Sequence, residues 1–453
     1  MTKKLFNEFP NVSANEWKQK IQADLKGADY NNTLIWHTNE GIDVKPFYHP
    51  EAFESIEEVP ETKVTSWTIA QTIYVDDVTI ANNIAVYALN RGAETIKFIL
   101  PNTTVSITQL LHNITAETLY FECLFCDDDF VKTIQNHDTK ARVYICTDII
   151  GHLARSGNWY YNLKEDHGQF SNIVNYTSQF SIDTSLYQNA GANTVQQLAY
   201  TLAHCNEYLN YLHSEKSLKN KKLTLTLNVS VGSNYFFEIA KLRALRTLIE
   251  LFADTYECKL ETNIFATPTK RNKTLYDYNT NMLRTTTECM SAILGGANSI
   301  CNLPYDAIYH KNNEFGDRIS RNQLLILKHE SYFNMVNNPA DGAYYIETLT
   351  KQLAEKALTL FKDIETQGGF LSQLKEGVIQ RKIKESAQKE QDQFDSGKLI
   401  LVGSNKHPNN EDRMKNELEL YPFVKTKPRK TLIEPLIEKR LSETLEQQRL
   451  HNE

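Results

Sequence analysis

The chain has 453 residues, of which 41% are hydrophobic and 23% are charged, and these proportions exclude disordered and fibrous proteins. Its formal net charge of -7 gives no overall attraction for nucleic acid. Seven scattered cysteines do not make a disulfide framework, and no apolar run is long enough to cross a membrane, so we expect a cytoplasmic protein.

The first predicted element is a short amphipathic helix in which Trp17, Ile21 and Leu25 share one face, with Gly27 as its stop. Residues 34–44 then alternate between apolar and polar side chains around a turn at 39–41. This pattern predicts an extended arm or hairpin. Because the arm is apolar and lies outside any repeating unit, we expect it to pack against another surface.

From about residue 79 the sequence alternates between helical and extended patterns. The predicted helices are 80–89, 194–213, 235–252 and 279–293. The predicted strands are 95–100, 118–124, 142–146, 179–182, 223–231, 258–265 and 298–302. This alternation is typical of a parallel α/β structure. Seven or eight such strands favour a closed (β/α)8 barrel of the TIM type, with a doubly wound open sheet as the alternative.

The best-defined element is a helix over 344–366, where apolar residues recur every three or four positions, and we expect it on the outside of the barrel. A charged helix is predicted over 371–394, and a short buried strand over 398–403. The polar tail beyond Ser404 contains several prolines, so we expect it to wrap over a surface and to end in a helix.

These patterns divide the chain into three predicted parts. Residues 1–65 form an N-terminal helix and extended arm, residues 66–370 form the barrel, and residues 371–453 form a C-terminal extension.

Cys123 and Cys126 have the Cys-x-x-Cys spacing that can bind zinc or cycle through a disulfide. A structural zinc site needs a second pair of ligands, and the aspartates at 127–129 would raise the pKa of a thiol. We therefore expect two buried structural side chains. A thiol or zinc protein built on this motif is the alternative, and it would require metal in the purified protein.

Lys241, Arg243 and Arg246 crowd a predicted helix that directly follows a strand. A basic helix beside a barrel mouth could hold an anionic ligand. Glu238 is placed to pair with Lys241, however, and buried ion pairs that fix the helix to its neighbours explain the charges equally well. No glycine-rich phosphate loop occurs in the sequence, so nucleotide chemistry has no support.

Seven segments, in matching order and spacing, resemble the methylmalonyl-CoA mutase family. They are residues 24–48, 66–73, 190–203, 236–246, 281–296, 317–331 and 338–357. The resemblance covers most of 15–403 and is weakest between about 101 and 178. It implies a (β/α)8 barrel whose central channel takes an acyl-CoA, and a separate cobalamin domain that presses its corrin onto the barrel mouth. The implied reaction is the radical isomerisation of methylmalonyl-CoA to succinyl-CoA.

The segment 181–203 keeps the frame of an active-site segment of this family, but its centre differs. Where catalytic members carry a Tyr-His pair, an alignment without gaps on residues 190–192 places Ser185 and Leu186. Neither side chain can act unaided as a general acid near neutral pH.

Two further active-site segments of the family also lack their polar groups here. The tyrosine and the two arginines of one segment correspond to Thr62, Thr65 and Ala70, so no cation meets a substrate carboxylate. The histidine and glutamine of the other correspond to Phe265 and Thr267. The resemblance therefore implies that this chain has no catalytic, cofactor-binding or metal-binding residues.

About 50 residues follow the segment 398–403, too few for a doubly wound cobalamin domain, and we expect none in this chain. The chain is similar to the small (beta) subunits of this family's heterodimers. We therefore predict a non-catalytic partner that stabilises a catalytic large (alpha) subunit, with adenosylcobalamin on that subunit and no membrane or nucleic-acid partner. The alternative is a barrel that binds or converts an acyl-CoA with a cobalamin domain supplied in trans. An open barrel interior would favour ligand binding, and a filled one a structural role.

Overall fold

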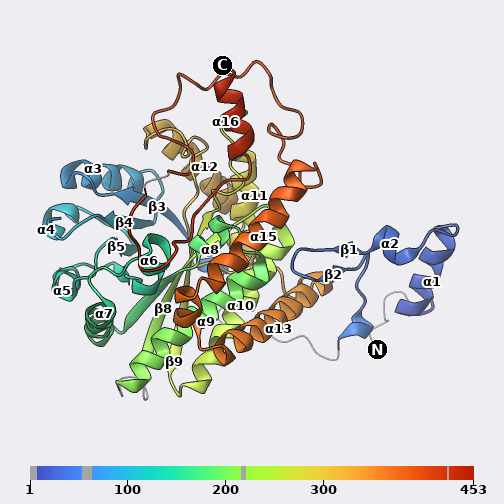
Figure 1. Cartoon of the computed structure of the whole chain (residues 1–453), viewed down its shortest axis with the longest axis horizontal. Coiled ribbons are helices and arrows are strands. Elements are labelled where there is room, and N and C mark those ends of the chain that lie inside the picture. The colour runs from blue at the N-terminus through green and yellow to red at the C-terminus, as the bar shows by residue number, and fades with distance from the viewer. Residues whose placement is uncertain (1–7, 54–63, 216–220, 426–427) are drawn as a thin grey trace.

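The computed structural model describes residues 8–53, 64–215, 221–425 and 428–453, and its centre is a barrel of eight parallel strands surrounded by helices (Figure 1). The strands are β3 (Thr68–Tyr74), β4 (Thr95–Leu100), β5 (Thr118–Cys123), β6 (Arg142–Cys146), β7 (Gln179–Asp183), β8 (Lys222–Val231), β9 (Lys259–Pro268) and β10 (Ser299–Ile300). Their spatial order is β6-β5-β4-β3-β10-β9-β8-β7, so the first and last strands of the barrel pair with each other. The predicted TIM-type fold is confirmed, and the open doubly wound sheet is wrong.

The strand missing from the prediction is β3. Its inward face carries Thr68, Ala70 and Thr72, while Ile69 and Ile73 on its other face are fully buried. Because small and polar residues face the barrel interior, the sequence of this strand does not read as a continuous apolar run. The structure therefore shows an eighth strand where the sequence pattern is weak.

Helices follow the strands around the outside of the barrel. Those within the barrel repeat are α3 (Val78–Leu89), α4 (Ile107–Leu110), α5 (Asp128–Gln135), α6 (Ile149–Ser156), α7 (Leu163–Thr177), α8 (Ser185–Ala190), α9 (Thr194–Ser214), α10 (Tyr235–Thr255), α11 (Thr280–Leu294) and α12 (Glu314–His329). The outward faces of the strands and the inner faces of these helices bury one continuous apolar core. The predicted helix over 344–366 is α13 (Tyr344–Thr366), and it packs on the outside against α9 and α10, as expected (Figure 1).

The predicted charged helix over 371–394 is two helices in the structure, α14 (Phe370–Lys375) and α15 (Val378–Asp395). They are separated at Gly377, whose φ of 72° lies in the left-handed region. A glycine adopts that conformation at little cost, so the chain turns there instead of continuing as one helix.

The strand predicted over 398–403 is wrong. Ile400 and Val402 are half exposed, and the segment forms only an isolated bridge between Val402 and Lys406. The side chain of Asn405 accepts from the amide of Leu401 and donates to the carbonyl of Leu399. Because these local bonds satisfy the backbone, the segment folds as a turn.

The predicted N-terminal helix and hairpin are confirmed. The helix is α1 (Ala14–Asp24), and after the short α2 (Tyr30–Leu34) the hairpin pairs β1 (Trp36–His37) with β2 (Asp43–Val44). Helix α1 buries none of its residues, and it lies at the end of an arm that extends away from the barrel (Figure 1). Within the described ranges, no helix is long and apolar enough to cross a bilayer.

Strands β6 and β7, the two ends of the strand order, are not paired through a backbone ladder as the other neighbouring strands are. There the side chain of Gln179 on β7 bonds to the backbone of β6. Its Oε1 accepts from the amide of Ile145 at 3.0 Å, and its Nε2 donates to the carbonyl of Val143 at 2.9 Å. One amide side chain therefore bridges the gap that remains in the strand ladder.

We expect the substitution Gln179→Leu to lower the free energy of unfolding by about 2–3 kcal/mol, because it leaves an amide and a carbonyl of β6 without their partner. Urea unfolding followed by circular dichroism measures the change. The matched control is Gln388→Leu on α15, where an exposed side chain bonds only to Asp392 one turn away. A loss no larger in Gln179→Leu than in Gln388→Leu would show that β6 and β7 do not depend on this bridge.

Candidate functional site at the carboxyl end of the barrel

The structure separates the positions at which the mutase resemblance places catalytic groups. Thr62 lies outside the described residues. Thr65 is exposed, and its amide donates to Asn337 Oδ1 at 3.1 Å. Ser185 begins α8, where its hydroxyl donates to Asp183 Oδ1 at 2.5 Å, and the neighbouring Leu186 is buried in the apolar core.

The remaining positions belong to strands of the barrel. Ala70 on β3 and Phe265 on β9 lie together in one cluster inside the barrel. Thr267, also on β9, lies two residues beyond Phe265 towards the carboxyl end of the strand. Of the positions that correspond to catalytic groups, only those on β3 and β9 face the barrel interior, and they carry Ala70, Phe265 and Thr267.

Aromatic side chains fill the barrel interior. Tyr120 of β5 stacks on Tyr144 of β6 with ring centroids 4.9 Å apart, and Phe265 meets Tyr120 edge to face at 4.9 Å. The Tyr120 hydroxyl lies 3.1 Å from Ser299 Oγ and accepts from Asn263 Nδ2 at 2.9 Å. Since Tyr120 has no exposed surface, the interior at this level is a packed core.

A charged group is also buried in the interior. Lys97 Nζ of β4 lies 2.6 Å from Glu122 Oε2, donates to Asn228 Oδ1 at 3.0 Å, and stands 4.6 Å from the centroid of the Phe265 ring. Burial alone would lower the pKa of Lys97, but the Glu122 carboxylate raises it above its ordinary value. The lysine therefore remains charged and acts as part of the filling of the barrel.

The C-terminal tail crosses the carboxyl end of the barrel, the face on which TIM-barrel enzymes carry their active sites. We call residues 431–443 the strap. Its backbone amides donate to carbonyls in the segments that follow β6, β7 and β9: Leu432 and Ile433 to Gly157, Leu436 to Ala154, Lys439 to Asn189, and Leu441 to Arg271. The predicted wrapping tail, which ends in α16 (Glu443–His451), is confirmed (Figure 1).

Gly157 fits the strap closely. Its φ is 79°, and a Cβ at this position would lie 2.8 Å from the carbonyl oxygen of Ile433. Only glycine combines this conformation with such a close approach of two backbone segments.

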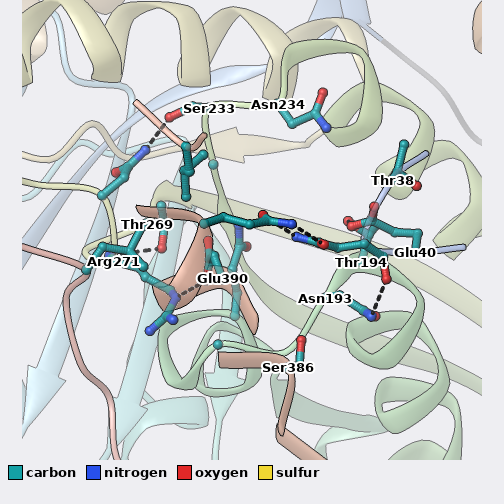
Figure 2. A pocket seen from close by; sticks show the side chains of 18 of the residues that line it. Thr38, Glu40, Asn193, Thr194, Ser233, Asn234, Thr269, Arg271, Ser386 and Glu390 are labelled. Carbon is teal, nitrogen blue, oxygen red and sulfur yellow. Dashed lines mark hydrogen bonds and ion pairs between the residues drawn. The ribbon is translucent and has the colours of Figure 1, made fainter. Parts of the chain in front are cut away.

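A cavity of about 290 Å³ lies beside the strap, between the β1-β2 hairpin, the beginnings of α9 and α10, and α15. Figure 2 shows that Arg271 and Glu390 approach each other at one end of the cavity, and that Thr194 and Glu40 approach each other at the other. Arg271 Nε donates to Glu390 Oε2 at 2.6 Å, and Thr194 Oγ1 donates to Glu40 Oε1 at 3.3 Å. These charged side chains of the cavity are therefore already paired with groups of the same chain.

The basic residues of α10 are fixed in the same way. Lys241 Nζ lies 2.5 Å from Glu238 Oε2, and burial lowers the pKa of Lys241. Arg243 Nη2 donates to both carboxylate oxygens of Glu347 on α13, at 2.7 Å to Oε1 and 2.8 Å to Oε2. The Arg246 guanidinium donates to the Gly296 carbonyl at 2.6 Å and to Asn298 Oδ1 at 2.7 Å. These contacts favour the explanation by buried pairs over an anion site on this helix.

Cys123 and Cys126 are both buried at the end of β5, and neither is in a disulfide. Burial, with Asp166 and Asp128 nearby, raises the pKa of Cys126 to about 12, and burial also raises the pKa of Cys123. Thiols with raised pKa values are poor nucleophiles near neutral pH. Among the described residues, no group of three or more His, Cys, Asp or Glu side chains could hold a metal ion.

Sequence reasoning missed a buried polar network behind α8. His204 Nε2 lies 3.0 Å from Asp148 Oδ1, His204 Nδ1 lies 2.9 Å from the Tyr187 hydroxyl, and the Tyr208 hydroxyl donates to Asp148 Oδ1 at 2.6 Å. Burial would raise the pKa of Asp148, but the contact with His204 lowers it. The histidine has no exposed surface, and the network joins α8, α9 and the loop after β6, where the Asp148 side chain is 10% exposed. The spacing of His204 and Tyr208, one helical turn apart, is the only sequence signal for it.

Comparisons with known proteins agree on one family. The family described as methylmalonyl-CoA mutase matches residues 131–450. The chain is similar to the methylmalonyl-CoA mutase small subunit of Porphyromonas gingivalis, with 34% identity over 90% of this chain and 71% of that protein. It is 26% identical to the methylmalonyl-CoA mutase of Rhizobium meliloti over 89% of this chain, and 27% identical to the mitochondrial enzyme of Mus musculus over 93%. The matched region spans 64% of the length of each of these last two relatives.

Proposed function

The chain belongs to the methylmalonyl-CoA mutase family, and from that premise we propose that it is the small (beta) subunit of a heterodimeric mutase. In this proposal the complex isomerises methylmalonyl-CoA to succinyl-CoA, and this chain stabilises a catalytic large (alpha) subunit without taking part in the chemistry. The observation that carries the proposal is the filled interior of the barrel, around Tyr120, Tyr144 and Phe265.

An acyl-CoA threaded along the axis of a barrel needs an open channel. Here the stacked rings of β5 and β6 and the ring of β9 occupy the axis, and the Lys97–Glu122 pair adds to them. The positions that would need a proton donor carry Leu186 and Phe265 instead. Both findings support a structural role over the alternative of an acyl-CoA-converting barrel that borrows a cobalamin domain.

The carboxyl end of this barrel does not fit a corrin either. In the resemblance, the corrin presses directly on the barrel mouth, but here the strap bonds across that face to Gly157, Asn189 and Arg271. We therefore assign adenosylcobalamin to the large subunit in the proposed complex.

The N-terminal arm is the proposed interface element, together with the outer helices. Helix α1 has no buried residue, and Trp17 on its apolar face is 49% exposed. An apolar helix face at the end of an extended arm is the kind of surface that a partner chain covers. In this proposal residues 1–65 act as the arm, 66–370 as the barrel, and 371–453 as an extension that closes the barrel mouth.

Co-expression with the large subunit of the same organism tests the proposal. We expect a stable complex with mutase activity in the presence of adenosylcobalamin, no activity and no CoA binding by this chain alone, and reduced stability of the large subunit alone. Trp17→Glu should weaken the complex by about tenfold or more, whereas Tyr161→Glu, at an aromatic residue of comparable exposure between α6 and α7, should not. Full activity and unchanged stability of the large subunit without this chain would contradict the proposal.

A further inference from the structure

A second cavity, which we call the mouth cavity, lies under the C-terminal tail at the carboxyl end of the barrel. Its volume is about 540 Å³, and its walls come from segments that follow barrel strands and from residues 421–425, 436–440 and 443 of the tail. We propose that the mouth cavity is a binding site for a small phosphate-bearing anion. This site is separate from the subunit role proposed above and does not depend on it.

The position of the cavity is the first argument. Lys270 and Arg271 follow β9, the seventh strand of the barrel, and Ala307 and Ile308 follow β10, the eighth. In TIM barrels the loops after the seventh and eighth strands frequently form a phosphate site. The analogy is one of fold, and it places the cavity where this architecture most often holds a phosphate.

The charge of the walls is the second argument. Although the chain is acidic overall, with a net charge of -7, cationic side chains outnumber carboxylates around this cavity. The cations are Arg155, Lys270, Arg271, Lys425, Lys439 and Arg440, and the carboxylates are Glu438 and Glu443. The three arginines are already paired with carboxylates, so the local excess of positive charge comes from the three lysines, and it attracts anions.

The arginines and the lysines have different roles. Arg155 pairs with Asp183 and Glu438, and Arg440 with Glu446, so these guanidinium groups are held in place by carboxylates. None of the described residues forms an ion pair or a hydrogen bond with the ammonium groups of Lys270 and Lys439. These two lysines are therefore available to bind an anion that enters the cavity.

The site is also built before any ligand arrives. The backbone amide of Lys439 donates to the Asn189 carbonyl, and the Asn189 side-chain oxygen accepts from Thr269 Oγ1 at 2.7 Å and from the amide of Lys270 at 3.1 Å. Asn189 is buried and lines the cavity. It therefore fixes the backbones of both lysines relative to each other, and a ligand does not have to order them.

Isothermal titration of the full chain with inorganic pyrophosphate at low ionic strength tests the proposal. We expect saturable binding of one pyrophosphate per chain that weakens as salt is added. The double substitution Lys270→Gln with Lys439→Gln should weaken binding by about tenfold or more, because both ammonium groups are lost. The main-chain bonds of the strap remain in this variant, so its unfolding midpoint should stay close to that of the unchanged chain.

The matched control is Lys351→Gln with Lys362→Gln on the exposed face of α13, which changes the net charge equally. This control should bind pyrophosphate as the unchanged chain does. The proposal is overturned if pyrophosphate does not bind, or if both double variants lose affinity to the same extent, since binding would then follow the total charge and not this cavity.

Discussion

We expect the substitution Glu288→Ala to lower the free energy of unfolding by about 3–5 kcal/mol at neutral pH, because it leaves a buried lysine without its counter-charge. Glu288 on α11 and Lys273, in the loop after β9, are both almost fully buried, with Lys273 Nζ 2.7 Å from Glu288 Oε2. The Lys273 carbonyl also accepts from Arg440 Nη1 of the strap at 2.9 Å. The pair thus supports the loop on which the strap rests.

The pH dependence of this variant gives a second readout. Burial already lowers the pKa of Lys273, and loss of the carboxylate lowers it further, whereas the same lysine in the unfolded chain keeps a pKa of about 10.4. Between the folded and the unfolded pKa the unfolded state binds more protons, so the stability of the variant rises with pH. We expect its deficit relative to the unchanged chain to shrink as the pH rises from 7 towards 10.

Two further variants separate this explanation from a simple loss of packing. Lys273→Met combined with Glu288→Leu removes both charges and should recover most of the lost stability. Glu385→Ala, which breaks an exposed contact with Lys382 on α15, should have little effect. If Glu288→Ala were as stable as Glu385→Ala at pH 7, the charge of Lys273 would not require its partner.

The second large effect is expected in the barrel interior. Tyr120→Ala should lower the free energy of unfolding by about 3–5 kcal/mol, because it removes a ring in contact with Tyr144 and Phe265. The surrounding strands cannot move inward to fill the cavity that is left. Tyr120→Phe, the matched control, keeps the ring and loses only the bonds to Asn263 and Ser299. Its expected cost is about 1–2 kcal/mol.

Chemical denaturation of the two variants in parallel measures these effects. A cost of Tyr120→Ala equal to that of Tyr120→Phe would mean that the ring contributes little and that the interior tolerates open space. That result would weaken the main support for a structural role of this barrel.

Regular periodicity in the sequence predicted most of the fold. Long elements such as α13 and β8 have strong apolar patterns, and their predicted bounds lie within a residue or two of the observed ones. The errors arose where a local polar group competes with the pattern. Asn405 satisfies the backbone of the segment predicted as a strand, and Gly377 divides the helix predicted over 371–394.

The sequence named the residues at the candidate site, but it did not predict their surroundings. The sequence indicated that Leu186 and Phe265 stand where proton donors would be expected, and the structure places both in buried surroundings. Tyr120 and Tyr144, which close the interior, lie in the region where the family resemblance is weakest. They stand opposite each other on the neighbouring strands β5 and β6, and no local pattern in the sequence reports which residues of two strands are paired.

The strap can bond to the barrel only late in the synthesis of the chain. Gly157 and Ala154 leave the ribosome long before their bonding partners in the strap, which lie close to the end of the chain. At translation rates of roughly 5–20 residues per second, these carbonyls lack their strap partners for a time on the order of tens of seconds. The nascent barrel therefore exposes its mouth until the strap has been synthesised. During that interval the carbonyls of Gly157 and Ala154 lack the strap amides that bond to them in the mature protein.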